Sequence, residues 1–249
     1  MAPGRLTEED EWEDDVWFDE VQPFEYHDPA LRANKSKPNL FRGGVKAKHI
    51  TPKMGTILTG VKMEELSDAG KDELALLITE RKIVVLREQS DFLHAGPQFQ
   101  QDFMAYFGPL SIQPVSGSVK GHPPFHIIHR DHNEEEIANF FERKLTSTLW
   151  HHDVSYEKQP PGYVMLGILA CPDVGGDTDS EKDMLLKFLV DHVCMGHDFQ
   201  ARVGWEKHSV VMFDGRSTLH TATVDYDSRI QARHLFRLAA MTEKTHVYR

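Results

Sequence analysis

The sequence predicts an α+β fold that is mainly β. Amphipathic helical patterns lie mostly in the first half of the chain, whereas short apolar runs bounded by turn signals follow one another in the second half. Strands gathered after helices are typical of α+β domains rather than of alternating α/β folds. A chain of 249 residues with 40% apolar residues is long enough to bury the core of such a domain.

Two helices and three short strands are predicted in the first half of the chain. One helix begins at its capping residues Ser67 and Asp68 and ends near Arg81. The other follows Pro97, a residue favoured in the first helical turn, and stops at Gly108. The strands are expected over 43–50, 55–63 and 83–87.

The second half is expected to consist mostly of strands. A polar loop or short helix is predicted over 132–144, and a helix over 180–194, where Ser180 and Asp183 form the start of a capping box. The strands of this half are expected over 125–130, 162–171, 201–205, 210–213 and 233–241.

Charge and cysteine content limit the classes of partner and the cellular compartment to be expected. The net charge of −11 argues against nucleic acids and anionic membrane surfaces as general partners. Nine acids lie between Glu8 and Glu20, so residues 1–30 are predicted to be an acidic, mostly disordered tail before a single domain, 31–249. No signal-peptide pattern is present, the run 163–171 is too short to span a bilayer, and two cysteines give no disulfide framework. A cytoplasmic protein is therefore expected.

His151 and Asp153 lie in a segment, TLWHHDVSY, that has the composition of a strand. Strand neighbours two apart project to the same face, so these two side chains would converge on one point. With the distant His220 they make a set of two histidines and one carboxylate, which is the kind of set that holds Fe(II) on one side and leaves positions open. The pattern His-x-Asp is weak by itself in a chain with 15 histidines.

Two arginines share one face of the last predicted strand, because alternation places Arg233 and Arg237 on the same side. If that face is buried, each guanidinium needs an anion, since an unpaired buried charge costs several kcal/mol. The alternative is that both arginines bridge to acidic side chains on a sheet surface.

Four motifs follow one another in a fixed order: WHHD, GGDT, DGRSTLH and the paired arginines of the last strand. In this order, from about Leu31 to Lys244, the chain resembles the taurine/alkylsulfonate (TauD/TfdA-type) family of Fe(II)- and 2-oxoglutarate-dependent dioxygenases, and particularly its fungal members. The resemblance implies a double-stranded β-helix, or jelly-roll, core with helices packed outside it.

The resemblance also implies roles for individual residues. Thr178 and Arg233 match the pair that binds the distal carboxylate of 2-oxoglutarate, and Arg237 matches the arginine that receives the anionic group of the substrate. The reaction implied is hydroxylation of a small anionic compound, a sulfonate or a carboxylate, by O2, with succinate and CO2 as products. Homo-oligomers are possible in this family. The residues matching the iron ligands, which serve catalysis, are His151, Asp153 and His220.

Two features depart from the family pattern. Gln113 and Ser116 stand where the taurine enzymes have a histidine and a tyrosine for the sulfonate, so Gln113 is the candidate substrate contact and taurine is not the expected substrate. Only 42 positions separate Thr178 from His220, whereas relatives use more than twice as many. An internal deletion, and with it a shortened jelly-roll core, is therefore expected.

Two other interpretations of the motifs remain open from the sequence. His151, His152 and Asp153 could be the His-Asp pair of a metal phosphohydrolase, although such sites are built on helices. A non-catalytic jelly-roll paralogue could instead bind a metal or a small acid without turnover. The further histidines His126 and His129, like His152, are expected to point away from the site or to surround it.

Overall fold

One mixed β-sheet dominates the structure, a computed structural model that describes residues 22–112, 117–130, 150–154, 157–170, 199–221 and 233–244. In these residues the sheet has eight strands in the order β1-β2-β3-β7-β6-β8-β5-β4. Only the pair β2–β3 is parallel, and the other neighbours are antiparallel. The strands are β1 Lys46–His49, β2 Thr56–Thr59, β3 Ile83–Leu86, β4 Ser118–Val119, β5 His122–Arg130, β6 Pro161–Ala170, β7 Val210–Asp214 and β8 Arg233–Met241.

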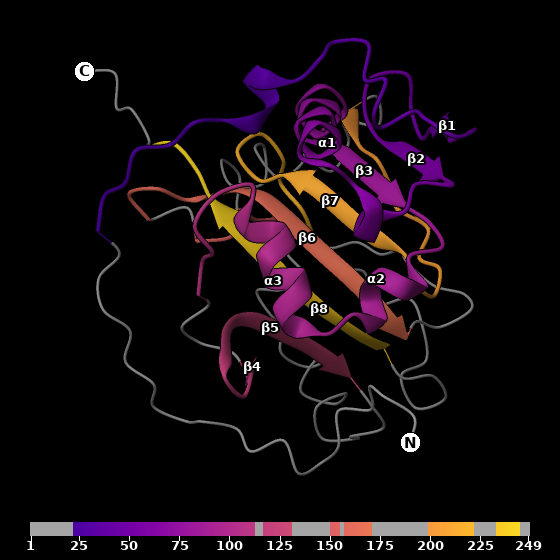
Figure 1. Ribbon diagram of the computed structural model, residues 1–249. Coiled ribbons are helices and arrows are strands. Elements are labelled where there is room, and N and C mark those ends of the chain that lie inside the picture. Colours follow the sequence, from indigo (N-terminus) through magenta and orange to yellow (C-terminus); the bar gives the residue numbers. More distant parts are fainter. Residues whose placement is uncertain are drawn as a thin grey trace, which may run out of the picture.

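The helices lie together on one face of this sheet, as Figure 1 shows for α1, α2 and α3. No helix in the described ranges is both long and apolar enough to cross a membrane. The helical elements are the 3-10 turns η1 Pro29–Arg32 and η2 Met63–Glu65 and the helices α1 Asp68–Arg81, α2 Ser90–His94 and α3 Pro97–Ala105.

The main hydrophobic core fills the space between the helices and the sheet. Tyr163 and Met165 of β6 face the helices, whereas their neighbour Val164 packs in a second, smaller cluster with Phe213 and Ala239. Alternation along the strand produces this division, since successive side chains point to opposite faces. The sheet therefore separates a helix-covered face from a second face, which carries the candidate functional residues.

Local sequence signals account for the helix ends. The Ser67 side chain accepts a hydrogen bond from the backbone N–H of Gly70, and Pro97 is the first residue of α3. At the other end of α1, Lys82 has a φ of 66° and donates its backbone N–H to Ile78. These elements confirm the helices predicted after Ser67 and Pro97.

Two local predictions are wrong, and the short helix α2 was not predicted. Residues 201–205 form no strand. His151 and Asp153 do not lie in a continuous strand: His151 makes an isolated bridge, and Asp153 follows in a turn. Residues 132–144 and 180–194 lie outside the described residues, so their predictions stay untested.

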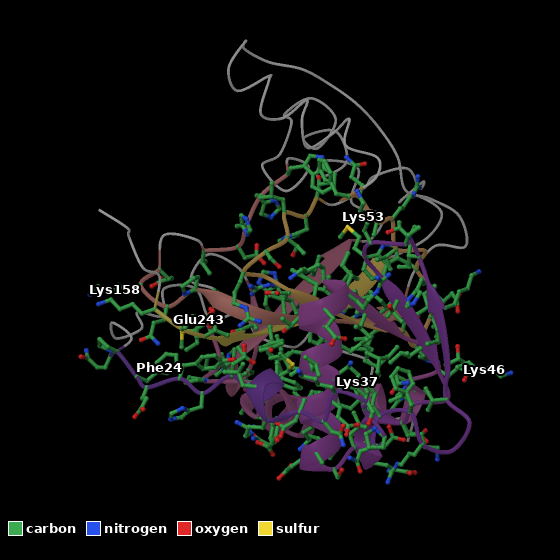
Figure 2. The ribbon with its side chains drawn as sticks, turned by 90° about the horizontal axis from the view of Figure 1, so that it is seen from above. Phe24, Lys37, Lys46, Lys53, Lys158 and Glu243 are labelled. Carbon is green, nitrogen blue, oxygen red and sulfur yellow. The ribbon has the colours of Figure 1, made fainter. Side chains whose placement is uncertain are left out.

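The last part of the predicted acidic tail contacts the sheet. Phe24 donates its backbone N–H to the Gln159 side chain, and Asp28 accepts a hydrogen bond from the Tyr163 hydroxyl. In Figure 2, Phe24 and Glu243 are labelled at the same end of the molecule, far from Lys46. The described part of the predicted tail therefore packs against the folded chain. Residues 1–21 lie outside the described ranges, where the tail stays a prediction.

Candidate metal centre

His151 and His220 meet through their backbones. The N–H of His151 donates to the carbonyl of His220 at 2.9 Å, and the N–H of His220 donates to the carbonyl of His151 at 3.0 Å. The two rings lie with centroids 4.4 Å apart. A reciprocal pair of hydrogen bonds of this kind fixes two residues opposite each other, although 69 positions separate them in the sequence.

Asp153 completes the group from the turn after His151. Its Oδ1 lies 3.5 Å from Nε2 of His151 and 3.7 Å from Nε2 of His220. Val154, the next residue, has a φ of 39°, so the chain turns sharply there. One ligand atom from each of the three residues lies within 4.8 Å of the others, and all three side chains are partly buried. The donor set fits Fe(II), which two histidines and one carboxylate can hold on one face.

Arg237 binds the carboxylate that the histidines approach. Its Nε donates to Oδ2 of Asp153 at 2.9 Å, on the side away from the oxygen that faces the imidazoles. The Arg237 side chain is 7% exposed, and its Nη2 is buried without a hydrogen-bond partner among the described residues. The guanidinium thus neutralises Asp153 with one nitrogen and leaves another available as a donor.

The charges of Asp153 and His220 suit metal binding. Burial tends to raise the pKa of Asp153, but the hydrogen bond from His151 and the positive charge of Arg237 outweigh it and hold the pKa well below its usual range. Burial lowers the pKa of His220 to about 4, although Asp153 opposes this shift. Asp153 is therefore an anion and His220 a neutral imidazole at pH 7, as metal ligands must be.

His126 lies beside this group on the neighbouring strand. It is the register partner of Arg237 between β5 and β8, so the two residues share a face of the sheet. Burial, reinforced by the charge of Arg237, lowers the pKa of His126 to about 4. The sequence left open whether His126 points away from the site or surrounds it. Its position opposite Arg237 places it beside the site. Only the pairing of two distant strands could have revealed that place.

Three other predicted site residues cannot be placed around this centre. Thr178 and Gln113 lie outside the described residues. Arg233 is in β8, where its backbone pairs with Arg130 of β5, but its side chain is not described. Their roles in binding 2-oxoglutarate and substrate stay predictions.

The phosphohydrolase interpretation does not fit this geometry. His151 lies in a backbone bridge and Asp153 in a turn, whereas the His-Asp pair of that class is carried by helices. Nδ1 of His152 donates a hydrogen bond to the backbone carbonyl of Gly215 at 3.1 Å, so this histidine supports the backbone near the site.

Comparison with known proteins identifies the family. The model of the family described as taurine catabolism dioxygenase TauD, TfdA family matches residues 46–180 and 178–239. The chain belongs to this family. An alpha-ketoglutarate-dependent sulfonate dioxygenase of Saccharomyces cerevisiae is 31% identical, over 94% of this chain and 76% of the yeast protein. The alpha-ketoglutarate-dependent dioxygenase cnsM of Penicillium expansum is 29% identical, over 89% of this chain and 84% of that protein.

Solved structures share the fold of this TauD/TfdA member. A taurine dioxygenase from Burkholderia xenovorans has a TM-score of 0.62 at 19% identity, with 81% of this chain and 90% of that chain covered. The enzyme AAD-2, solved with Mn(II) and N-oxalylglycine, has a TM-score of 0.59 at 13% identity, with 83% and 100% covered. The mainly β, jelly-roll type of fold predicted from the sequence is thereby confirmed. Membership of the family implies Fe(II) and 2-oxoglutarate as cofactor and co-substrate.

The comparisons also bear on the predicted deletion. The alignment with the yeast protein spans 317 positions, more than the 249 residues of this chain, so the yeast protein has residues without a counterpart here. The family model matches in two pieces that meet at residues 178–180. That junction directly follows the GGDT motif, where the sequence predicted the missing segment.

Proposed function

We propose that this chain is an Fe(II)- and 2-oxoglutarate-dependent dioxygenase that hydroxylates a small anionic substrate, a sulfonate or a carboxylate, and releases succinate and CO2. One observation supports this proposal most directly: two histidines and one carboxylate converge beside a buried guanidinium with a nitrogen available as a donor. The first three residues suit Fe(II), and the guanidinium suits an anion.

His151, Asp153 and His220 would hold the iron, and they would be the catalytic centre in that sense. When bound, the iron and 2-oxoglutarate supply the oxidising chemistry with O2. The chain contributes position and charge. The hydrogen bond from His151 and the charge of Arg237 keep Asp153 ionised, and burial keeps His220 neutral. Thr178 and Arg233 remain the candidates for the distal carboxylate of 2-oxoglutarate.

The anionic character of the substrate rests on Arg237. Its Nη2 is a buried donor without a hydrogen-bond partner in the part of the chain that the structure describes. Leaving such a donor unpaired costs about 1–3 kcal/mol, and a charged oxygen of the substrate would remove this cost. Two substrate classes, sulfonates and carboxylates, carry such an oxygen. The name of the yeast relative favours sulfonates as the first compounds to test.

The first test combines a spectrum with turnover. The purified chain is loaded with Fe(II) without oxygen, 2-oxoglutarate is added, and the weak visible band of the iron–2-oxoglutarate chelate is recorded. We expect the band in the unchanged chain and its loss in His151→Ala. His94→Ala, which changes an exposed histidine of α2, is the matched control and should keep the band. Admission of O2 with a panel of sulfonates and carboxylates should then yield succinate.

A non-catalytic member of the family is the second candidate, and the missing segment favours it. The yeast relative has residues without a counterpart here, and we infer that they lie after the GGDT motif and would form one wall of the pocket. A chelate band without succinate or O2 consumption for any acid of the panel would decide for this candidate.

The cytoplasmic location stays a prediction from the absence of a signal-peptide pattern and of a disulfide framework.

A further inference from the structure

A tightly bonded turn leads from β7 to His220. The carbonyl of Asp214, the last residue of β7, accepts hydrogen bonds from the Thr218 hydroxyl at 2.7 Å and from the Ser217 N–H at 3.3 Å. The Asp214 carboxylate accepts the Ser217 hydroxyl at 2.9 Å. Asp214 is buried, with a side chain 4% exposed. His220 comes two residues after this turn, so the conformation of the turn determines the position of His220.

Arg216, inside this turn, contacts segments outside it. Its Nε donates to Oδ1 of Asp214 at 2.9 Å, and its Nη1 donates to Oδ2 of Asp28 at 2.6 Å. The guanidinium also lies over the ring of Tyr163, 5.0 Å from the centroid, and its Nη2 is 3.4 Å from the Thr79 hydroxyl. These contacts with strand β6, helix α1 and the N-terminal segment leave Arg216 little freedom.

Asp28 is the second anchor of this guanidinium. Its Oδ1 accepts the Tyr163 hydroxyl at 2.7 Å and the N–H of Ala30 at 2.9 Å, so its orientation is fixed from both sides. The Arg216–Asp28 pair is 188 positions apart in sequence, and both side chains are mostly buried, at 19% and 16% exposed. In partly buried surroundings such a charged pair is stronger and less screened by salt than one at the surface.

The turn contacts the segments of both candidate histidine ligands. Two residues after it comes His220, whose backbone pairs with that of His151. The carbonyl of Gly215, inside the turn, accepts the hydrogen bond from His152, the residue between His151 and Asp153. A displacement of the turn would therefore move His220 and release one contact of the segment that carries the other two candidate ligands.

We infer that Arg216, held by Asp28 and Asp214, is a positioning residue for the candidate metal ligands. This inference rests on the proposed metal centre and extends it to the N-terminal segment, which the sequence assigned to a disordered tail. Residues that orient metal ligands typically change metal affinity by 10–100-fold when they are replaced. Since Arg216 acts on two ligand segments through one turn, we expect an effect in that range.

The test is the affinity of the full-length chain for Co(II), followed by its visible absorption, which reports the ligand geometry. Arg216→Met should raise the Kd for Co(II) by 10-fold or more and shift the absorption. Asp28→Asn retains the cap on Ala30 but loses the charge, and it should act in the same direction. Arg216→Lys, which restores the charge, should recover part of the affinity. Urea unfolding of each metal-free variant shows that it is folded.

Arg32→Met is the matched control. It removes another arginine–aspartate pair between the N-terminal segment and α1, Arg32–Asp72 at 2.7 Å, that does not touch the turn. An unchanged Co(II) affinity in this control supports the inference, whereas an equal loss in Arg32→Met and Arg216→Met would overturn it in favour of general loosening of the segment. Arg216→Met and Asp28→Asn with the affinity of the unchanged chain would overturn it as well. If the unchanged chain itself binds no Co(II), the metal centre fails, and the inference with it.

Discussion

At the scale of single residues, the central feature is a partly buried carboxylate whose charge is already neutralised before any metal binds. Asp153 receives the guanidinium of Arg237 on one oxygen and faces two imidazoles with the other. Burying a lone carboxylate costs several kcal/mol, and a hydrogen-bonded partner charge offsets much of this cost. The site can therefore keep its anionic ligand in place without a metal.

The pH dependence of stability follows from a histidine next to this pair. The pKa of His126 is lowered from 6.5 to about 4 by burial and by the charge of Arg237, with Asp153 acting in the opposite direction. Between these two pH values the unfolded chain binds more protons than the folded chain, so the free energy of unfolding falls as the pH is lowered from 6.5 towards 4. By pH 5 the loss from this group is about 2 kcal/mol.

The measurement is urea unfolding of the metal-free chain at pH 7, 6 and 5. We expect His126→Gln to make the free energy of unfolding less dependent on pH in this range. His220, whose pKa is lowered in the same direction, should preserve part of the dependence. His27→Gln, at an exposed histidine, is the control and should leave the curve as it is. A His126→Gln curve parallel to that of the unchanged chain would contradict the expected burial of His126.

At the scale of elements, a buried carboxylate of α1 binds the loop between η1 and β1. Glu73 is 1% exposed and accepts the N–H of Leu40 at 2.7 Å and the side-chain amide of Asn39 at 2.8 Å. Glu73→Ala would leave these two donors unsatisfied. We expect the free energy of unfolding to fall by about 2–3 kcal/mol, since an unsatisfied buried donor costs about 1–3 kcal/mol.

Urea unfolding at pH 7 measures this loss, and Glu65→Ala provides the comparison. Glu65 forms an exposed ion pair with Lys62 at 3.0 Å, a type of contact that contributes little to stability. Similar losses in the two variants would mean that the Glu73 contacts are not the reason for the destabilisation.

The elements that the sequence predicted well are those with strong local signals. Ser67 and Pro97 mark helix starts, and β3, β6, β7 and β8 are apolar runs that become buried strands. Residues 201–205 have the composition of a strand but are not in one, and the carbonyl of Gly204 accepts a hydrogen bond from the Arg87 side chain. Helix α2 escaped notice because it has five residues and no side-chain cap. A strand needs a neighbour and a short helix needs packing, and neither is visible in a local pattern.

The candidate metal site could be predicted in part, because its three residues lie in local sequence motifs. The spacing of His151 and Asp153, with the motif that ends at His220, drew attention to the three residues that the structure brings together. Arg216 and Asp28 were missed, although Arg216 lies inside that motif. Their contact joins positions 188 apart, and the acidic composition around residues 7–20 had suggested that everything before residue 31 is unstructured.

At the scale of the whole molecule, the bridge between His151 and His220 lies outside the eight named strands, and it forms in a chain of 249 residues that is shorter than its alignment with the yeast relative. β7 and β8 lie on either side of β6, and β5 follows β8, so the strands next to the site all come from described segments. The segment that we infer to be missing is therefore expected to affect the pocket wall and turnover first. Because the three candidate ligands lie together in the described residues, metal binding is expected to survive.

This expectation can be tested through the stability of the entire chain. A ligand that binds only the folded state raises the free energy of unfolding by about 2.7 kcal/mol at 100 times its Kd. For a domain of this size, such a gain corresponds to a rise in Tm of about 5–10 °C. We expect Mn(II), which cannot start the oxidation, to produce this rise in the unchanged chain and in His94→Ala, but not in His220→Ala. Since His220 pairs with His151 through backbone hydrogen bonds, which alanine also makes, its replacement removes one candidate ligand and leaves the sheet intact. An equal rise in His220→Ala would place the bound metal elsewhere. No rise in the unchanged chain would mean that the metal site, as well as part of the pocket, is lost with the segment that we infer to be missing after the GGDT motif.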